Sequence, residues 1–330
     1  MLLTLAATSL ASKLKPAKGS GASGSPKGSL TIFDIPKFAR EQLDLHGMVL
    51  STSLLQGADR AFLQKIVENA DKVGCPCLTL IESTPQPVGD PDKAGPAADR
   101  ILRVVQAAHW LGCNAVAIPV DCPDDDDAMS DAAEVLRPIL RKAEKMELNL
   151  CIASGASGLT ARPERVTDLL KKVGGFRIGT LPDFDSASRM SGKPDSPAPA
   201  AKGKAAAAAN DASSYLRRLV PYASTVLAVV REFEPGKGKN AAPAHKPYDL
   251  LDCVRTVAAV GFDGSLAIDW RGPASQDPIE NIVAARDAIR SIIGGGTIVD
   301  EDDLDELAGV EADVDSDDEK DPKTDREDEA

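Results

Sequence analysis

The chain has 330 residues, of which 43% are hydrophobic but only 4% aromatic, and a formal net charge of −13. This content fills the core of one large domain or two smaller ones, packed by Ala, Val, Leu and Ile as is typical of α/β proteins with buried parallel strands. The acidity is local, because residues 297–330 carry 17 acids and three bases, which leaves residues 1–296 with a net charge of +1. No basic patch with interleaved aromatic residues occurs, so nothing indicates nucleic-acid binding.

The chain begins with an apolar segment, MLLTLAATSLAS. No Lys or Arg precedes it, and the run from Leu2 to Ala7 is short for a membrane span. We interpret it as a first β-strand, with a secretory signal as the alternative. No other segment is long and apolar enough to cross a bilayer, so no membrane association is expected.

Six cysteines occur in this long chain, without the spacing of a disulfide framework or a zinc site. Free cysteine is among the most readily buried residue types. The sequence therefore predicts buried thiols in a reducing compartment, which favours the cytoplasm. The cysteines are Cys75, Cys77, Cys113, Cys122, Cys151 and Cys253.

Eight short apolar runs predict strands, and each is followed by a segment with apolar residues at helical spacing. The strands are LLTLAAT at the N-terminus, His46–Ser51, CLTLIES from Cys77, Asn114–Asp121, Leu148–Ala153, Phe176–Leu181, Ser224–Val230 and Ser265–Asp269. The helices are one that starts at Asp34-Ile35-Pro36 with Asp34 as N-cap, one that opens near Gly57-Ala58-Asp59 and includes Gln64–Val73, and Ala97–Leu111, Ala132–Met146, Pro163–Val173, Tyr215–Val220, Tyr248–Val260 and Asp277–Ile293.

This alternation indicates parallel βαβ units, and eight of them predict a single closed (β/α)8 TIM barrel. An open doubly wound sheet is the alternative, but it gives no reason for the count to stop at eight. Two low-complexity insertions, at about 13–29 and 188–212, are expected to be unstructured. The predicted organisation is thus a barrel over residues 1–296 and an acidic disordered tail over 297–330.

Three segments resemble the sugar phosphate isomerase/epimerase family of xylose isomerase-like TIM barrels. They are FDIPKFAREQLDLHGMVLSTSLL, GLTARPERVTDLLKKVGGFRIGTLPDF and YDLLDCVRTVAAVGFDGSLAIDW. The resemblance covers most of residues 1–295 and implies a sugar-type substrate at the C-terminal mouth of the barrel. It also implies a divalent metal ion (Mn, Mg or Zn) held by a Glu after strand five, an Asp after strand six, a His after strand six or seven and a Glu after strand eight. In such a site the cation holds the sugar oxygens while the two Glu residues move the proton.

The family pattern is only partly present in this chain. Asp183 stands where the family has its acid after strand six, and Asp269 replaces the Glu after strand eight with one methylene less. After strand five, Ser154–Gly158 stands where the family has Glu-Asn-His-Gly-Gly, so neither acid nor imidazole is found there. The resemblance therefore leaves Asp183 and Asp269 to carry any metal. The three histidines fall at the start of a strand, within a helix and in the long loop after strand seven: His46, His109 and His245.

Two further acids also follow strands, Glu82 after strand three and Asp121 after strand four. With Asp183 and Asp269 they could ring the mouth as an oxygen-rich site for a cation or sugar hydroxyls, with Glu82 among the catalytic acids and Asp121 binding substrate. The alternative is that polar residues simply gather where buried strands meet solvent.

Two other side chains are candidates for substrate binding. Arg231 follows strand seven, and its guanidinium fork suits a phosphate or carboxylate. Trp270, with Arg271 next to it, follows strand eight and could stack on a sugar ring. A surface ion pair and a packing role at the barrel rim are the respective structural alternatives.

Two functional hypotheses remain. The chain is either an isomerase of the sugar isomerase/epimerase type with a rearranged site, or a pseudoenzyme that binds a small molecule or a partner. Because proton transfer needs a positioned base and strand five supplies none, the sequence leaves open whether the chain is an enzyme. The resemblance implies that any small-molecule ligand is a sugar or sugar derivative.

Overall fold

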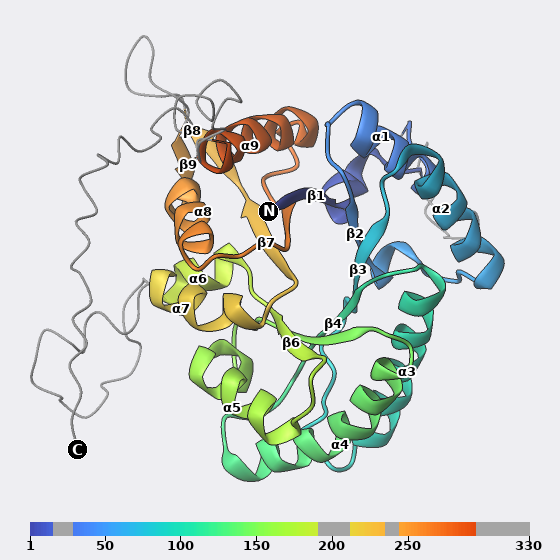
Figure 1. Cartoon of the computed structure of the whole chain (residues 1–330), viewed down its shortest axis with the longest axis vertical. Coiled ribbons are helices and arrows are strands. Elements are labelled where there is room, and N and C mark those ends of the chain that lie inside the picture. Colours follow the sequence, from blue (N-terminus) through green and yellow to red (C-terminus); the bar gives the residue numbers. More distant parts are fainter. Residues whose placement is uncertain (16–28, 191–211, 235–243, 295–330) are drawn as a thin grey trace, which may run out of the picture. The chain divides into compact units, whose positions relative to one another are not determined.

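The computed structural model describes residues 1–15, 29–190, 212–234 and 244–294. Met1–Ile293 forms one compact unit, in which helices surround a curled sheet of eight parallel strands (Figure 1). The predicted TIM barrel is thereby confirmed against the open doubly wound sheet. Most of the two predicted insertions and the whole acidic tail lie outside the described residues, so the division into a barrel and a tail stays a prediction.

All eight predicted strands are present, each within two residues of its predicted ends. They are β1 Leu2–Ala6, β2 Met48–Ser51, β3 Cys77–Ile81, β4 Ala115–Pro119, β5 Asn149–Ala153, β6 Ile178–Leu181, β7 Thr225–Val230 and β10 Ser265–Trp270. Their order in the sheet is β6-β5-β4-β3-β2-β1-β10-β7. The edge strands β6 and β7 meet through the parallel bridges Thr180–Ala223 and Asp183–Leu227. The sheet thus curls until its two edges touch.

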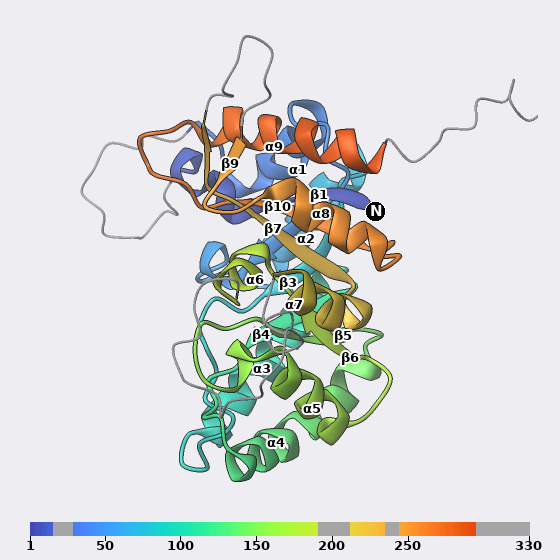
Figure 2. The same ribbon diagram turned by 90° about the vertical axis from the view of Figure 1, so that its left-hand side faces the viewer.

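The predicted helices are also present, and Figure 2 shows α4 and α5 side by side on the outside of the barrel. The helices are α1 Ile35–Glu41, α2 Arg60–Val73, α3 Ala94–Trp110, α4 Asp126–Glu144, α5 Pro163–Val173, α6 Phe184–Met190, α7 Ala212–Leu219, α8 Leu250–Ala259 and α9 Pro278–Ile293. The 3-10 turns are η1 Ala7–Lys13, η2 Ile32–Asp34, η3 Thr52–Leu54, η4 Leu159–Ala161 and η6 Val220–Tyr222.

Helix ends follow the capping residues of the sequence. Helix α2 begins after Asp59, near its predicted start. The Asp59 carboxylate caps it by accepting a hydrogen bond from Phe62 N at 2.8 Å. Asp34 stands at the N-cap position of α1 with Pro36 in the first turn, as predicted, but its side chain makes no capping hydrogen bond to that helix. The Asp34 carboxylate instead accepts from Thr31 N at 2.8 Å and Thr31 Oγ1 at 2.6 Å, in a capping box on the preceding turn η2.

Two elements were not predicted. Helix α6 follows β6 almost directly, and the loop expected after β7 contains an antiparallel pair, β8 Glu232–Glu234 and β9 Ala244–Lys246. In this hairpin the ring of Phe233 packs edge-on against that of His245, with centroids 5.4 Å apart. An ion pair between Lys246 and Glu234 joins the same two strands.

Two apolar clusters form the core. The larger one lies between sheet and helices, and the smaller one fills the barrel interior with mostly small side chains. Lower in the barrel, the hydroxyl of Thr225 bonds those of Thr79 at 2.9 Å and Ser265 at 2.8 Å. These side chains fill the barrel interior, so the barrel is a packed core rather than a pore. The interior cluster comprises Val49, Ala115, Ala117, Cys151, Ala153, Leu181, Leu227, Val229 and Ala267.

Two further predictions can be compared with the structure. All six cysteines are free and buried, as predicted, whereas the compartment stays a prediction. Among the described residues, no helix has the length and apolar character that a membrane span needs.

Candidate functional site

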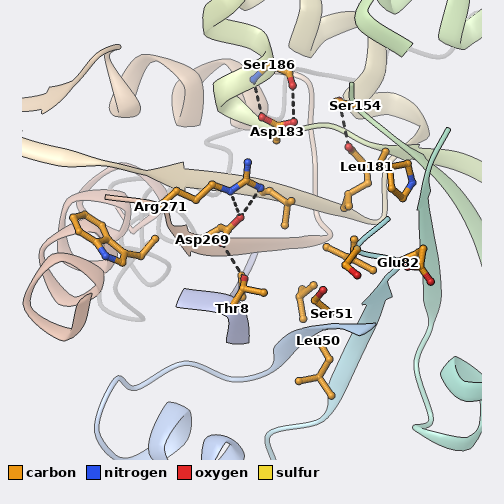
Figure 3. Close-up of a pocket in the computed structure, with 18 of the residues that line it drawn as sticks. Thr8, Leu50, Ser51, Glu82, Ser154, Leu181, Asp183, Ser186, Asp269 and Arg271 are labelled. Atoms are coloured by element: carbon orange, nitrogen blue, oxygen red, sulfur yellow. Dashed lines mark hydrogen bonds and ion pairs between the residues drawn. The ribbon is translucent and has the colours of Figure 1, made fainter. Parts of the chain in front are cut away.

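A cavity of about 450 Å³ opens where the barrel strands end at their carboxyl termini (Figure 3). Its size falls within the range of roughly 300–1,000 Å³ typical of small-molecule sites. Its wall carries hydroxyl, carboxylate and guanidinium groups above apolar side chains of the barrel interior. The lining residues are Ala6, Thr8, Val49, Leu50, Ser51, Ile81, Glu82, Ser83, Pro119, Ala153, Ser154, Leu181, Asp183, Ser186, Arg189, Leu227, Asp269, Trp270 and Arg271.

Glu82 follows β3, and its side chain is completely buried. Its Oε2 accepts a hydrogen bond from Nε of Arg100 at 2.8 Å, and its Oε1 accepts from Thr52 Oγ1 at 3.1 Å and Thr84 N at 3.0 Å. Arg100 comes from α3 and lines a groove on the outer surface rather than the cavity. The predicted catalytic acid is therefore tied to a cation on the outside of the barrel.

Asp183 follows β6 and is buried at the start of α6. Its Oδ1 accepts from Ser186 N and its Oδ2 from Ser186 Oγ, both at 2.7 Å (Figure 3). This is the geometry of a helix N-cap. Burial raises the pKa of Asp183 above its usual value, although both hydrogen bonds act in the opposite direction.

Asp269 is the penultimate residue of β10, and Arg271 lies two residues further along the chain. Its Oδ2 accepts from Arg271 Nε at 2.8 Å and Arg271 Nη2 at 2.7 Å, and its Oδ1 accepts from Thr8 Oγ1 at 3.2 Å (Figure 3). The carboxylate side chain is 6% exposed, whereas the arginine side chain is 43% exposed. The exposed member of this ion pair is thus the cation. The sequence had pointed to Arg271 only together with Trp270, as a pair that could stack on a sugar ring, and not as an ion-pair partner of Asp269.

Trp270 also lines the cavity, but its side chain is largely buried. Its backbone N–H donates to Ser9 Oγ at 2.8 Å. The indole ring lies so close to Gly272 that a methyl group at that position would approach the ring carbons to 2.1 Å. The ring therefore packs at the barrel rim, and sugar stacking stays a prediction.

A second ion-pair network lies on α6, where sequence patterns gave no signal. Asp185 Oδ1 and Oδ2 accept from Arg231 Nε at 2.9 Å and Nη2 at 2.8 Å, and Oδ2 also accepts from Arg189 Nη1 at 3.0 Å. The hydrogen bond from Arg231 holds the pKa of Asp185 below its usual value. Arg231, predicted to bind an anionic ligand, is thus paired within the protein and does not line the cavity. Arg189 does line it, and its Nη2 donates to Ser186 Oγ at 2.6 Å.

The ends of β4 and β5 supply no acid to the cavity. Asp121 is exposed outside the lining, and its backbone N–H donates to Gln86 O at 2.9 Å. At the end of β5, Ser154 lines the cavity, with its hydroxyl bonded to that of Tyr215 and to Leu181 O at 3.3 Å. The structure thus brings together Glu82, Asp183 and Asp269 of the four predicted acids.

None of the three histidines lines the cavity. His245 lies on β9, where its Nε2 accepts from Arg231 N and its Nδ1 faces Tyr248 O, both at 2.9 Å. These partners assign the proton to Nδ1. Burial lowers the pKa of His245. His46 bonds Arg40, and His109 is exposed on α3.

The carboxylates at the mouth do not fit the divalent metal that the resemblance implies. Oxygen-binding cations take several carboxylate, carbonyl or water oxygens at once. Here the oxygens of Asp183 accept from Ser186, and a guanidinium already lies on Asp269. Within the described part of the chain, no three His, Cys, Asp or Glu side chains are grouped to hold a metal ion.

Comparison with known proteins supports the fold alone. No protein-family model and no curated protein matches the chain. An L-ribulose 3-epimerase structure has a TM-score of 0.62 at 12% identity, covering 94% of this chain and 100% of that one. A D-psicose 3-epimerase with D-tagatose from Clostridium cellulolyticum H10 has a TM-score of 0.56 at 16% identity, covering 93% and 96%. A xylose isomerase-like TIM barrel protein from Mycobacterium smegmatis in complex with magnesium has a TM-score of 0.58 at 13% identity, covering 89% and 95%.

Proposed function

We propose that this chain, which has the xylose isomerase-like TIM barrel fold, binds a carbohydrate-type small molecule at the C-terminal mouth of its barrel. The observation that carries this proposal is the cavity of about 450 Å³, in which polar side chains surround an apolar floor. Ligand sites of TIM-barrel proteins lie at this end of the barrel. The sugar epimerases among the similar structures support the class of ligand.

The lining suits a polyhydroxylated molecule. Thr8, Ser51, Ser83 and Ser154 present hydroxyl groups from four different strand ends. Hydroxyls both donate and accept hydrogen bonds, as sugar hydroxyls do. Apolar side chains of β2, β6 and β7 lie below them and suit the C–H face of a sugar ring.

Binding without metal-dependent isomerisation is the function that this geometry supports best. Each carboxylate of the cavity is hydrogen-bonded to a protein donor, and the donor set does not fit a metal ion. A second candidate is metal-independent proton transfer, which one observation favours. Asp183 borders the cavity, and burial raises its pKa as is found for catalytic acids and bases.

The proposal is tested by calorimetric titration with D-fructose, D-tagatose and D-psicose. We expect binding of at least one of them, and expect Ala153→Leu to weaken it by about tenfold or more because the new side chain fills part of the cavity. Ala156→Leu is the matched control, since Ala156 is exposed in the loop that follows β5. Absence of binding, or equal binding by the Ala153→Leu protein, would overturn the proposal. Incubation of the bound sugar with wild type and with the Asp183→Asn protein separates binding from turnover. Conversion of the sugar by wild type but not by the variant would indicate proton transfer by Asp183.

A further inference from the structure

Two arginine side chains, Arg189 and Arg271, line the cavity and bring positive charge to it. They differ in which of their nitrogens the protein already uses, because both terminal nitrogens of Arg189 are engaged but only one of Arg271 is. Arg189 gives Nη1 to Asp185 and Nη2 to Ser186. Arg271 places Nε and Nη2 on one oxygen of Asp269, so its Nη1 has no hydrogen-bond partner among the described residues.

Arg271 is held in place by a buried support. Asp269 is 6% exposed, is fixed on its other oxygen by Thr8, and is part of barrel strand β10, where it pairs with Val229 of β7. The long arginine side chain is thereby oriented before any ligand arrives, which reduces the entropy lost on binding. In Figure 3 the guanidinium of Arg271 lies between Asp269 and Asp183, which also line the cavity. Asp269 thus acts as a positioning residue for a guanidinium that remains available.

Acids that could repel an anion have protein partners. Arg100 approaches Glu82 from the outer surface, Arg231 binds Asp185 through both nitrogens of its fork, and Ser186 donates twice to Asp183. Burial raises the pKa of Asp183 and so disfavours its negative charge. Apart from its own partner Asp269, the acids near Arg271 are thus held by protein donors, and the exposed guanidinium still faces the cavity.

We propose that the cavity recognises an anionic sugar derivative, whose carboxylate or phosphate oxygen accepts a hydrogen bond from Nη1 of Arg271. This inference rests on the proposed function, which supplies the site for the polyol part of the ligand. Guanidinium groups bind both kinds of oxyanion through charge-assisted hydrogen bonds. A fixed arginine thus supplies the positive charge that contacts the ligand oxygens.

The test is calorimetric titration with three probes: D-glucitol, D-gluconate and D-glucose 6-phosphate. We expect at least one anionic probe to bind about tenfold or more tightly than D-glucitol, and expect Arg271→Gln to abolish that preference while D-glucitol binding remains. Arg162→Gln is the matched control. Arg162 precedes α5 at the same end of the barrel, is exposed, and pairs with Asp124 and Glu164 outside the cavity. It should leave the preference unchanged.

The outcomes separate this inference from the proposed function. Preference for D-gluconate assigns a carboxylate, and preference for D-glucose 6-phosphate assigns a phosphate. Equal binding of all three probes, or an unchanged preference in Arg271→Gln, overturns the inference and leaves the proposed function standing. Failure of wild type to bind any of these probes or the neutral sugars overturns both. If Arg271→Gln does not fold, Arg271→Lys replaces it, because its ammonium can pair with Asp269 but has no second edge to offer a ligand.

Discussion

The ends of β3 and β10 carry the same chemistry in opposite arrangements. Glu82 with Arg100, and Asp269 with Arg271, each join a buried carboxylate to an arginine at 2.8 Å. Arg100 reaches Glu82 from α3 on the outside of the barrel, whereas Arg271 lines the cavity itself. The direction from which the cation approaches therefore decides the role of the pair. At β3 the arginine neutralises the acid, and at β10 the acid orients the arginine.

The largest expected effect comes from breaking the pair at β3. Arg100→Ala should lower the free energy of unfolding by about 3 kcal/mol, because it leaves the carboxylate of Glu82 buried without a cation. The value lies at the low end for buried pairs since Arg100 is itself 42% exposed. Urea denaturation measures the change.

Arg103→Ala on the same helix is the matched control for this experiment. Arg103 is exposed and lines only the outer grooves, so its removal should change the unfolding free energy by less than about 0.5 kcal/mol. Sugar binding by the folded Arg100→Ala protein should remain close to wild type, whereas Arg271→Gln should affect binding more than stability. Equal losses of stability in the two α3 variants would contradict the contrast between β3 and β10.

Asp183 provides a third arrangement, in which neutral donors alone hold the carboxylate. Asp183→Ala should lower the free energy of unfolding by about 1 kcal/mol through loss of the N-cap on α6. Asp183→Asn keeps an acceptor for the Ser186 N–H. Because burial raises the pKa of Asp183, the stability that its protonated form contributes is present below pH 3.8 and is lost as the pH rises through the folded-state pKa. Asn carries no charge, so this variant should be at least as stable as wild type near pH 7.

Thermal melts of the two Asp183 variants near pH 7 and pH 4 distinguish a cap from an ion-binding acid. If Asn destabilises the protein as much as Ala does, the negative charge itself is required. That result would contradict the assignment of Asp183 as a helix N-cap that needs only a hydrogen-bond acceptor.

The fold could be predicted from sequence because each strand–helix unit has its own local signal. Continuous apolar runs such as Leu148–Ala153, followed by amphipathic helices, occur eight times, and this count decided the architecture. Helix α6 was missed because its seven residues follow β6 directly and are too few for a clear helical period. The β8–β9 hairpin was missed because each strand has three residues, fewer than the alternation of polar and apolar positions needs.

The site could be predicted only in part. Sequence position finds the acids at strand ends, since a residue after a buried parallel strand must emerge at one end of the barrel. Partners of these acids depend on tertiary structure. Arg100 lies 18 residues from Glu82, and Arg231 lies 46 residues from Asp185, so no spacing rule connects them. The pairing of Arg271 with Asp269 was missed although the two lie two residues apart, because no pattern of the sequence specifies which side chain near a strand end faces the cavity.

The smallest expected effect concerns the pair of Asp185 and Arg231, which lies outside the cavity lining and is supported by His245. Nε2 of His245 accepts the Arg231 backbone N–H, so protonation of this nitrogen would remove the bond. Burial lowers the pKa of His245, and the stability of its neutral form is therefore present above pH 6.5 and lost as the pH falls through the folded-state value. We expect the melting temperature to fall between about pH 7.5 and pH 5, and expect His245→Gln to reduce that dependence. His109→Gln, on the exposed face of α3, is the control.

Because Arg231 does not line the cavity, His245→Gln should leave the preference for anionic sugars intact. A loss of that preference would show that the Asp185 pair and the Arg271 pair act together.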